Sequence, residues 1–345
     1  MTTSFLIVRL GSLGDLIHTL PAVAAIRRVY PDSVIDWLVE APHRELLDLV
    51  PILSSVVVLE GRDFTGWLAT SRTLRARRYG VALDFQGLLK SAALARFSGA
   101  RSVVGFDRKA LREPAARLFY TNSPKVGEGR HVIDKNLAMV SALLETNEAL
   151  QPTAAARATI DFPLRDIQSR ALEQLRGQVT GSFALVNPGA AWPNKRWPAS
   201  RFGAVARSLH ADQRLPSIVL WGPGEVPLAS DVVAASGDAA WLSPPTSIAD
   251  LVALVRGASL MVSGDTGPAH IAAAVGTPLV GIYGPTRPAR NGPWSAGDIT
   301  VSRDAICQCH HLRRCKLETM CLMDIQVDEV LNAIERRLAL EPTSV

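Results

Sequence analysis

The chain has 345 residues, 48% of them apolar, and its 37 Lys and Arg against 32 Asp and Glu give a formal net charge of +5. That length exceeds one ordinary hydrophobic core and predicts two domains, while the modest charge suits an anionic ligand or membrane surface and makes no case for nucleic acid. The N-terminus lacks a basic segment, and no run approaches the roughly 20 apolar residues of a membrane span. We therefore expect no signal peptide and a cytoplasmic protein.

The N-terminal half alternates strand and helix patterns. A strand over 5–10 leads through a glycine-containing loop into a helical pattern over 16–29, which stops before Pro31. Runs rich in β-branched residues predict further strands at 34–39, 56–59, 81–85 and 103–106. Strands that alternate with helices predict a parallel sheet with helices on both faces.

The pattern fades between about 151 and 181, which we interpret as a linker, and then restarts. It predicts strands at 183–187, 218–221, 260–263, 279–283 and 299–302, and an amphipathic helix at 327–340. We therefore predict two α/β domains in tandem, at 1–170 and 180–325, with a C-terminal helix and tail at 326–345. Ligands bind at the carboxyl ends of the strands in such sheets, so the loops that follow the strands are the candidate sites.

The loop after the first strand reads Gly-Ser-Leu-Gly-Asp at 11–15. It is not the G-x-G-x-x-G of dinucleotide-binding proteins, because Leu13 stands where the second glycine should be and no third glycine follows. Asp15 has two interpretations at this helix start. It is either a helix N-cap, which the motif alone favours, or a general base.

A second strand-to-helix loop reads Gly-Asp-Thr-Gly-Pro-Ala-His at 264–270. The amides of Thr266 and Gly267, with the Thr hydroxyl, can bind a diphosphate at the helix N-terminus. Asp265 would repel phosphate, so we expect it either to bond sugar hydroxyls or to cap the turn. His270 belongs to the same candidate donor-binding set, although a structural histidine is its simpler interpretation.

Two further loops of the C-terminal half carry charge. Lys195 and Arg196 follow a strand end, where they can neutralise a leaving phosphate or form an exposed basic loop. Glu225 follows another strand end and can bind a ribose diol, as acidic residues do in nucleotide-binding sheets, or lie on the surface.

The N-terminal half is rich in cations with few aromatic residues between them, which argues against single-stranded nucleic acid. Most of these cations are interpreted as a solvated face. Lys90, Arg108 and Arg112 lie in or near strand-end loops and are the better candidates for binding an anionic acceptor.

All four cysteines fall within fifteen residues: Cys307, Cys309, Cys315 and Cys321. Their spacing departs from C-x-x-C…C-x-x-C, so a structural metal site and plain thiols are equally supported.

Taken together, these residues resemble glycosyltransferase family 9, the ADP-heptose:lipopolysaccharide heptosyltransferases. The matching pieces are GSLGD (11–15) with HTLP (18–21), DFQGLLKSAA (84–93), REP (112–114), WPNKRWP (192–198), and DTGPAH (265–270) with YGPT (283–286). The segments 86–91 and 112–120 look most like the heptosyltransferase I branch.

The resemblance implies a GT-B fold, in which two Rossmann-like domains face each other across a cleft. It assigns the acceptor to the N-terminal domain and the nucleotide-sugar donor to the C-terminal domain. It also implies an inverting transfer from ADP-heptose that requires no metal or other cofactor.

The resemblance further implies roles for single residues. Asp15 stands at the family's proposed base, with Gly14 beside it on the acceptor side, and this context makes base the favoured interpretation. Lys195 stands at the lysine that contacts the donor diphosphate, and Glu225 approximately at an acid that contacts the ribose. The family's donor-binding turn falls on Asp265, Thr266 and Gly267.

The implied reaction moves heptose from ADP-heptose to Kdo of the lipid A inner core, by a monomer peripheral on the inner face of the cytoplasmic membrane. Heptosyltransferase II, or another sugar transferase of the family, is the alternative. A nicotinamide dehydrogenase would share the fold but should carry G-x-G-x-x-G, and a non-catalytic sugar-nucleotide-binding module would need no base.

Overall fold

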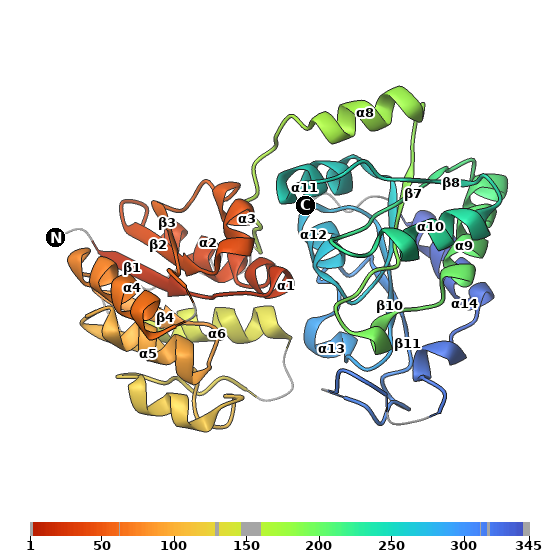
Figure 1. Ribbon diagram of the computed structural model, residues 1–345. Helices are drawn as coiled ribbons and strands as arrows, with labels where there is room; N and C mark the ends of the chain where they lie inside the picture. The colour runs from red at the N-terminus through yellow and green to blue at the C-terminus, as the bar shows by residue number, and fades with distance from the viewer. Residues whose placement is uncertain are drawn as a thin grey trace. The chain divides into compact units, whose positions relative to one another are not determined.

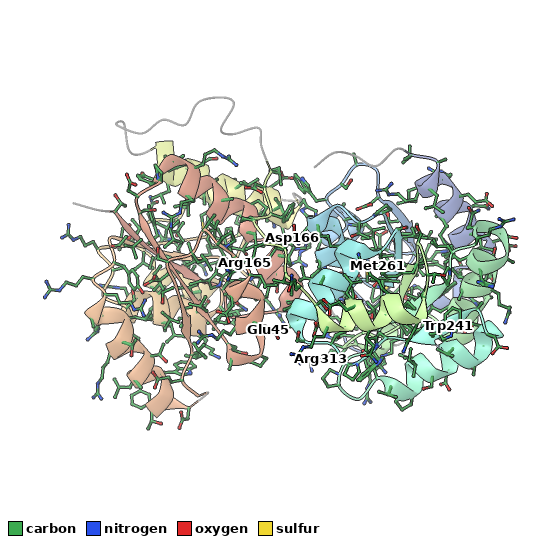
Figure 2. The ribbon with its side chains drawn as sticks, turned by 90° about the horizontal axis from the view of Figure 1, so that it is seen from above. Glu45, Arg165, Asp166, Trp241, Met261 and Arg313 are labelled. Carbon is green, nitrogen blue, oxygen red and sulfur yellow. The ribbon has the colours of Figure 1, made fainter. Side chains whose placement is uncertain are left out.

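The computed structural model describes residues 3–61, 63–127, 131–145, 160–310, 312–315 and 318–340. The chain divides into two compact units between Arg165 and Asp166, which Figure 2 labels. Each unit is a parallel β-sheet covered by helices (Figure 1). The predicted α/β class with parallel sheets is confirmed.

The N-terminal unit contains a five-stranded parallel sheet in the order β3-β2-β1-β4-β5. Its strands are β1 (Ser4–Val8), β2 (Val34–Val39), β3 (Ser55–Val58), β4 (Val81–Asp84) and β5 (Ser102–Gly105). Its α-helices are α1 (Leu13–Ile17), α2 (Leu20–Val29), α3 (Arg44–Asp48), α4 (Phe64–Ala76), α5 (Leu89–Phe97) and α6 (Val132–Glu145). Two 3₁₀ helices, η1 (Ala41–His43) and η2 (Pro114–Phe119), lie between them.

The C-terminal unit contains a six-stranded parallel sheet in the order β11-β10-β9-β6-β7-β8. Its strands are β6 (Ala184–Asn187), β7 (Ser217–Val219), β8 (Ala240–Leu242), β9 (Leu260–Gly264), β10 (Leu279–Tyr283) and β11 (Ile299–Ser302). Its α-helices are α8 (Arg170–Gln178), α9 (Ala199–Gln213), α10 (Val226–Ser236), α11 (Ile248–Gly257), α12 (Gly267–Val275), α13 (Pro288–Asn291) and α14 (Val327–Leu338), with 3₁₀ turns η4 (Pro193–Lys195) and η5 (Cys321–Asp324).

The structure departs from the sequence-based elements in three places. The helical pattern over 16–29 is two helices, α1 and α2, which meet at Thr19, where the Oγ1 hydroxyl donates to the carbonyl of Asp15 (2.8 Å). The segment interpreted as a linker contains α8, which packs against α11, while residues 151–159 lie outside the described residues. The three-residue strand β8 has no counterpart among the predicted strands.

The C-terminal helix α14 belongs to the core of its unit and does not form a separate appendage. Val330, Ala333 and Ile334 are buried in one cluster with residues of β10 and β11. Beside them the Arg337 Nε donates to Asp298 Oδ1 (3.1 Å), and both side chains are almost fully buried. The same Asp298 oxygen accepts the amide of Leu279, at the start of β10 (3.0 Å).

Arg337→Ala should therefore destabilise the protein. It leaves the buried carboxylate of Asp298 without a counter-charge, which typically costs about 3–5 kcal/mol. The matched control is Arg336→Ala, which removes an exposed arginine from the same turn and should change the free energy of unfolding by less than about 0.5 kcal/mol. Urea unfolding of both variants measures the difference, and equal losses would show that the ion pair does not hold α14.

Candidate functional site

Each sheet has one position where two neighbouring strands lead their chains in opposite directions. In the N-terminal unit β1 lies beside β4, and in the C-terminal unit β6 lies beside β9. Ligands in open α/β sheets bind at such switch points, outside the carboxyl ends of the strands. The loops after these four strands carry Asp15, Lys90, Lys195 and Asp265, so most of the predicted site residues gather at the two switch points.

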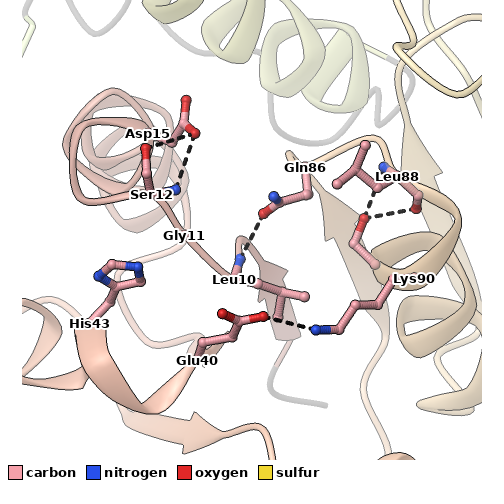
Figure 3. Close-up of a pocket in the computed structure, with 10 residues that line it drawn as sticks. Leu10, Gly11, Ser12, Asp15, Glu40, His43, Gln86, Leu88 and Lys90 are labelled. Atoms are coloured by element: carbon pink, nitrogen blue, oxygen red, sulfur yellow. Dashed lines mark hydrogen bonds and ion pairs between the residues drawn. The ribbon is translucent and has the colours of Figure 1, made fainter. Parts of the chain in front are cut away.

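A pocket of about 310 Å³ opens at the switch point of the N-terminal unit (Figure 3). It is lined by Leu10, Gly11, Ser12, Asp15, Glu40, His43, Gln86, Leu88, Lys90 and Ser91. Most of these side chains are polar, and they come from the loops after β1, β2 and β4. Such a lining suits a ligand that carries several hydroxyl or charged groups.

Asp15 lies in the first turn of α1, three residues after the N-cap residue Ser12. Its Oδ2 accepts the amide and the hydroxyl of Ser12, both at 3.1 Å, and its Oδ1 lies 2.5 Å from the Arg9 guanidinium. Asp15 is therefore not the N-cap itself but its reciprocal partner in a capping box. Its side chain is still 37% exposed and lines the pocket, so a ligand there can reach it.

The charge on Asp15 is set by opposing effects. Burial raises the pKa of its carboxyl, but Arg9 and the hydrogen bonds from Ser12 outweigh burial and leave the pKa below its ordinary value of 3.8. Asp15 is thus ionised at neutral pH and can accept a proton.

A second carboxylate, Asp84 at the end of β4, supports the loop whose residues Gln86 and Leu88 line the pocket. It is fully buried and accepts hydrogen bonds from the Tyr120 hydroxyl (2.7 Å) and the Ser91 hydroxyl (2.9 Å). It also accepts the amide of Gln86 (2.9 Å), whose side-chain Oε1 in turn accepts the amide of Leu10 (2.9 Å). Asp84 therefore holds the loop after β4 against the loop after β1.

The sequence analysis gave no site role to Glu40 and His43, and it included Gln86 only as part of the matching segment 84–93. Glu40 and His43 follow the carboxyl end of β2, a strand-end signal that was available but carried no motif. Burial lowers the pKa of His43 despite the nearby carboxylates of Glu40 and Asp15, so His43 is neutral at pH 7. Its imidazole fills the space above Gly11, where an added Cβ would lie 2.7 Å from Nε2.

The predicted acceptor residues have different positions. Lys90 lines the pocket, where its ammonium pairs with Glu40 Oε1 (2.8 Å) and lies 5.7 Å from the centre of the Trp67 ring. Gly14 is buried within α1. Arg108 and Arg112 are exposed and are not among the residues that line this pocket.

At the switch point of the C-terminal unit, Asp265 is the centre of a polar network. Its Oδ2 pairs with the Lys195 ammonium (2.6 Å), while its Oδ1 accepts from the Asn291 amide (3.0 Å) and lies 3.3 Å from His270 Nε2. Burial raises the pKa of Asp265, but His270 and Lys195 together hold it well below its ordinary value. Both carboxylate oxygens therefore have protein partners, and Asp265 orients Lys195 and His270.

Neighbouring residues complete this network. Lys195 keeps 17% of its side chain exposed, with its ammonium 4.9 Å from the centre of the Trp192 ring. Thr266 is the N-cap residue of α12, and its hydroxyl accepts from Asn187 Nδ2 (2.8 Å), which ties the end of β6 to the start of α12. Gly267 begins that helix, so its amide lies at the positive end of the helix dipole.

Glu225 reaches into the same group of loops. Its carboxylate accepts the amide of Gly222 (3.0 Å) and lies 3.9 Å from the Arg196 guanidinium. A Cβ added at Gly189 would come within 2.2 Å of this carboxylate, so a larger residue there would displace the Glu225 side chain from its position. The sequence therefore selected a set of residues that the fold brings together: Lys195, Glu225, Asp265, Thr266, Gly267 and His270.

The cysteines lie close together without a disulfide. Cys309 Sγ is 3.1 Å from Cys315 Sγ, and burial together with Cys307 raises the pKa of the Cys321 thiol to about 12. Within the described parts of the chain, no three His, Cys, Asp or Glu side chains are arranged to hold a metal ion.

None of the described helices is long and apolar enough to cross a membrane. Two tandem parallel sheets, each with a polar site at its switch point, form the architecture of nucleotide-binding α/β proteins. Residues 67–321 match the model of glycosyltransferase family 9 (heptosyltransferase), and the chain belongs to this family of enzymes.

Similar proteins agree with this assignment. Lipopolysaccharide heptosyltransferase 1 of Pseudomonas aeruginosa is 30% identical, over 88% of this chain and 84% of that protein. Its counterpart in Escherichia coli K12 is 26% identical, over 85% and 92%. The E. coli heptosyltransferase WaaC with ADP superposes with a TM-score of 0.73 at 22% identity, over 98% of this chain and all of that one.

E. coli heptosyltransferase II has a TM-score of 0.76 at 20% identity, over 98% of this chain and 99% of that one. These likenesses over the whole chain confirm the GT-B class of the fold.

Replacing Asp265 by Asn should destabilise the C-terminal unit. The variant leaves the Lys195 ammonium without its counter-charge and weakens the contact with His270, at a cost of about 3 kcal/mol. Because the folded-state pKa of Asp265 lies below the ordinary 3.8, its stabilising charge is fully present above that value and is lost as pH falls through the folded-state pKa. The deficit should therefore be constant from about pH 7 to pH 5 and shrink only below about pH 4.

Urea unfolding at several pH values tests this expectation. Asp231→Asn, which removes an exposed carboxylate from α10, is the matched control and should unfold like the parent. A deficit no larger than that of the control at pH 7 would contradict the role of Asp265 as the centre of the network.

Proposed function

We propose that this enzyme transfers heptose from ADP-heptose to Kdo of the lipid A inner core, which is the heptosyltransferase I reaction in lipopolysaccharide biosynthesis. One observation carries the proposal. In a chain of this family, an ionised, ligand-accessible carboxylate lines the pocket at one switch point, and an oriented lysine lies at the other. The relatives named lipopolysaccharide heptosyltransferase 1 support the same step.

The donor, in this proposal, binds the C-terminal unit. Lys195 contacts the diphosphate, which also accepts hydrogen bonds from the backbone amides of Thr266 and Gly267 at the start of α12. Glu225 bonds the ribose. Asp265 holds Lys195 in place, and with both of its oxygens engaged it contributes to the donor site mainly through that lysine. A solved E. coli relative, 24% identical to this chain, is described with ADP-2-deoxy-2-fluoro heptose, which supports ADP-heptose as the donor.

The acceptor binds the pocket of the N-terminal unit. Kdo carries a carboxylate, which can replace the Glu40 carboxylate in the ion pair with Lys90. Gln86 and neutral His43 offer hydrogen bonds to its hydroxyls. Gly14 contributes by packing α1 close to the pocket, and Arg108 and Arg112 bind anionic groups of the lipid outside the pocket.

The transfer is a single displacement with inversion. The acceptor hydroxyl attacks the anomeric carbon of heptose, Asp15 takes its proton, and the bond from that carbon to the diphosphate breaks so that ADP leaves with the electron pair. Asp15 is a weak base in the ground state, but the hydroxyl becomes far more acidic as the new bond forms. Lys195 and the α12 amides stabilise the charge on the departing ADP, so the proposal invokes no metal.

The decisive experiment is a donor and acceptor screen. The purified protein should release ADP from ADP-heptose in the presence of Kdo-lipid A, and the product should carry one added heptose. Release only with an acceptor that already bears heptose would assign the alternative, heptosyltransferase II, which shares the fold. We further propose that the protein acts as a cytoplasmic monomer on the inner face of the membrane.

Asp15→Asn should lower kcat by about 100-fold or more, because positioned proton transfer typically contributes 10²–10⁴-fold. The Asn side chain keeps an oxygen that can accept the amide of Ser12, but it loses the ion pair with Arg9, so the melting temperature should fall while donor affinity should hardly change. Asp250→Asn is a matched control, since Asp250 forms the same capping box with Ser247 at the start of α11. Turnover of Asp15→Asn within a few-fold of that control would leave Asp15 a purely structural role.

Lys195→Met should weaken donor use. The side chain keeps its length but loses a charge-assisted contact to phosphate, which is typically worth about 1.5–3 kcal/mol, or a loss of roughly 10- to 150-fold in kcat/KM for ADP-heptose. Steady-state kinetics with ADP-heptose varied measure the effect. Arg176→Met, at an exposed position of α8, should match the parent. Unchanged kinetics of the Lys195 variant would remove this lysine from the donor site.

A further inference from the structure

Exposed apolar side chains are concentrated on one part of the N-terminal unit. Among the described residues, five of the ten exposed large hydrophobic side chains belong to α4, α5 and η2. They are Phe64 (78% exposed), Leu68 (42%), Leu89 (43%), Phe97 (49%) and Leu118 (85%). Such a concentration on a protein surface marks an interaction site more often than single exposed residues do.

Sequence spacing aligns these side chains with cations. On α4 the exposed residues Phe64, Leu68, Arg72 and Arg75 are spaced by four, four and three residues, which places them on one face of the helix. On α5 the same reasoning aligns Leu89 with the exposed pair Arg96 and Phe97. Each helix therefore presents a solvent stripe that is apolar and positive.

Three contacts join the stripes into one surface. Lys90 lies over the Trp67 ring near the start of both helices, and Arg75 Nε donates to the carbonyl of Phe97 (2.9 Å) near their ends. The helices thus run side by side in the same direction. The rings of Phe97 and Phe119 meet edge to face with centres 6.5 Å apart, which joins η2 to α5. We name the exposed surface of α4, α5 and η2 the α4–α5 face.

The α4–α5 face carries an excess of positive charge. Its three elements contain four arginines, Arg72, Arg75, Arg96 and Arg117, and no Asp or Glu, while their fifth cation, Lys90, is paired with Glu40. The two carboxylates that flank them are engaged by backbone amides, Asp63 with Gly66 (3.0 Å) and Glu113 with Leu89 (2.7 Å). A second copy of the chain would bring these cations against each other in a two-fold contact, which disfavours self-association.

We propose that the α4–α5 face docks the enzyme on an anionic lipid bilayer. Exposed Phe and Leu insert among the headgroups, while the arginines pair with lipid phosphates, as in interfacial helices. The face adjoins the pocket within a single turn of helix, because Leu88 and Lys90 line the pocket while Leu89 is exposed beside them. Docking therefore brings the pocket to the headgroup layer, and this step rests on the proposed function for the lipid-linked acceptor.

Vesicle sedimentation tests the proposal. The protein should bind vesicles of phosphatidylethanolamine and phosphatidylglycerol, bind phosphatidylcholine vesicles poorly, and lose binding in high salt. The double variant Phe64→Ser/Leu118→Ser should bind the anionic vesicles at least tenfold more weakly. The double variant Arg72→Gln/Arg96→Gln should lose tenfold or more as well, since each arginine near a membrane surface contributes roughly fivefold in affinity.

The matched control is Ile306→Ser/Arg176→Gln, which changes an exposed apolar residue and an exposed arginine of the C-terminal unit and should bind like the parent. Equal binding to the two vesicle types, or equal losses in the control, would overturn the proposal. So would a dimer in sedimentation analysis that Phe64→Ser/Leu118→Ser dissociates in the absence of lipid.

Activity separates this inference from the proposed function. Transfer to a Kdo acceptor stripped of its acyl chains should be the same in the docking variants and the parent, while transfer to vesicle-embedded Kdo-lipid A should fall in the variants. Vesicle binding without any transfer from ADP-heptose would refute the proposed function and leave the docking surface intact.

Discussion

A parallel sheet places the carboxyl ends of all its strands on one edge, and where two neighbouring strands send their chains in opposite directions that edge must open. Both units of this protein meet that constraint between a central pair of strands, β1 with β4 and β6 with β9. The two loops at each opening lead away from each other, and their polar side chains line the space that is left between them. The candidate residues for catalysis and for donor binding follow from this topology.

A buried carboxylate stabilises the loops at each opening, but the two carboxylates have opposite electrostatic settings. Asp84 is surrounded by hydroxyls and amides, and burial raises its pKa despite them. Asp265 faces Lys195 and His270, and its pKa is lowered. The neutral hydroxyls and amides around Asp84 can fix the loop after β4 without bringing a positive charge to the pocket. A cation held by a carboxylate brings charge to the site, which is what a diphosphate requires.

Long apolar runs that end in Gly or Asp made most of the strands predictable, because burial on both faces leaves few polar residues within them. The strand β8 was not predictable in the same way, since it has three residues and its central Trp241 is exposed. Helix α8 was hidden by a polar composition, and it is stabilised by its packing against α11 and by its N-cap Ser169, whose hydroxyl accepts the amide of Leu172. Pro21 divides one helical pattern into α1 and α2, because it has no N–H to donate to the carbonyl of Ile17, and apolar periodicity alone does not show this break.

The site shows the same division. Asp15 in the N-terminal unit, and Lys195 and Asp265 in the C-terminal unit, stand at strand ends that the sequence marks, so their positions at the two switch points were predictable. Their partners were not, because Asn291 reaches Asp265 across 26 residues and Glu40 reaches Lys90 across 50. The sequence alone left open whether Asp15 is the N-cap, because Ser12 and Asp15 share one motif and either could start the helix; in the structure the N-cap is Ser12.

The place of α14 in the core has a consequence for biosynthesis. The described strands of the N-terminal unit are complete by Gly105 and the unit ends at Arg165, so a nascent chain can fold it while the C-terminal unit is still being translated. The C-terminal unit cannot close its core in the same way, because β10 and β11 need Val330, Ala333 and Ile334 from α14, which is made after the other described helices. During synthesis, the unit that carries Asp15 therefore matures first, and the unit that carries Lys195 waits until α14 has been made.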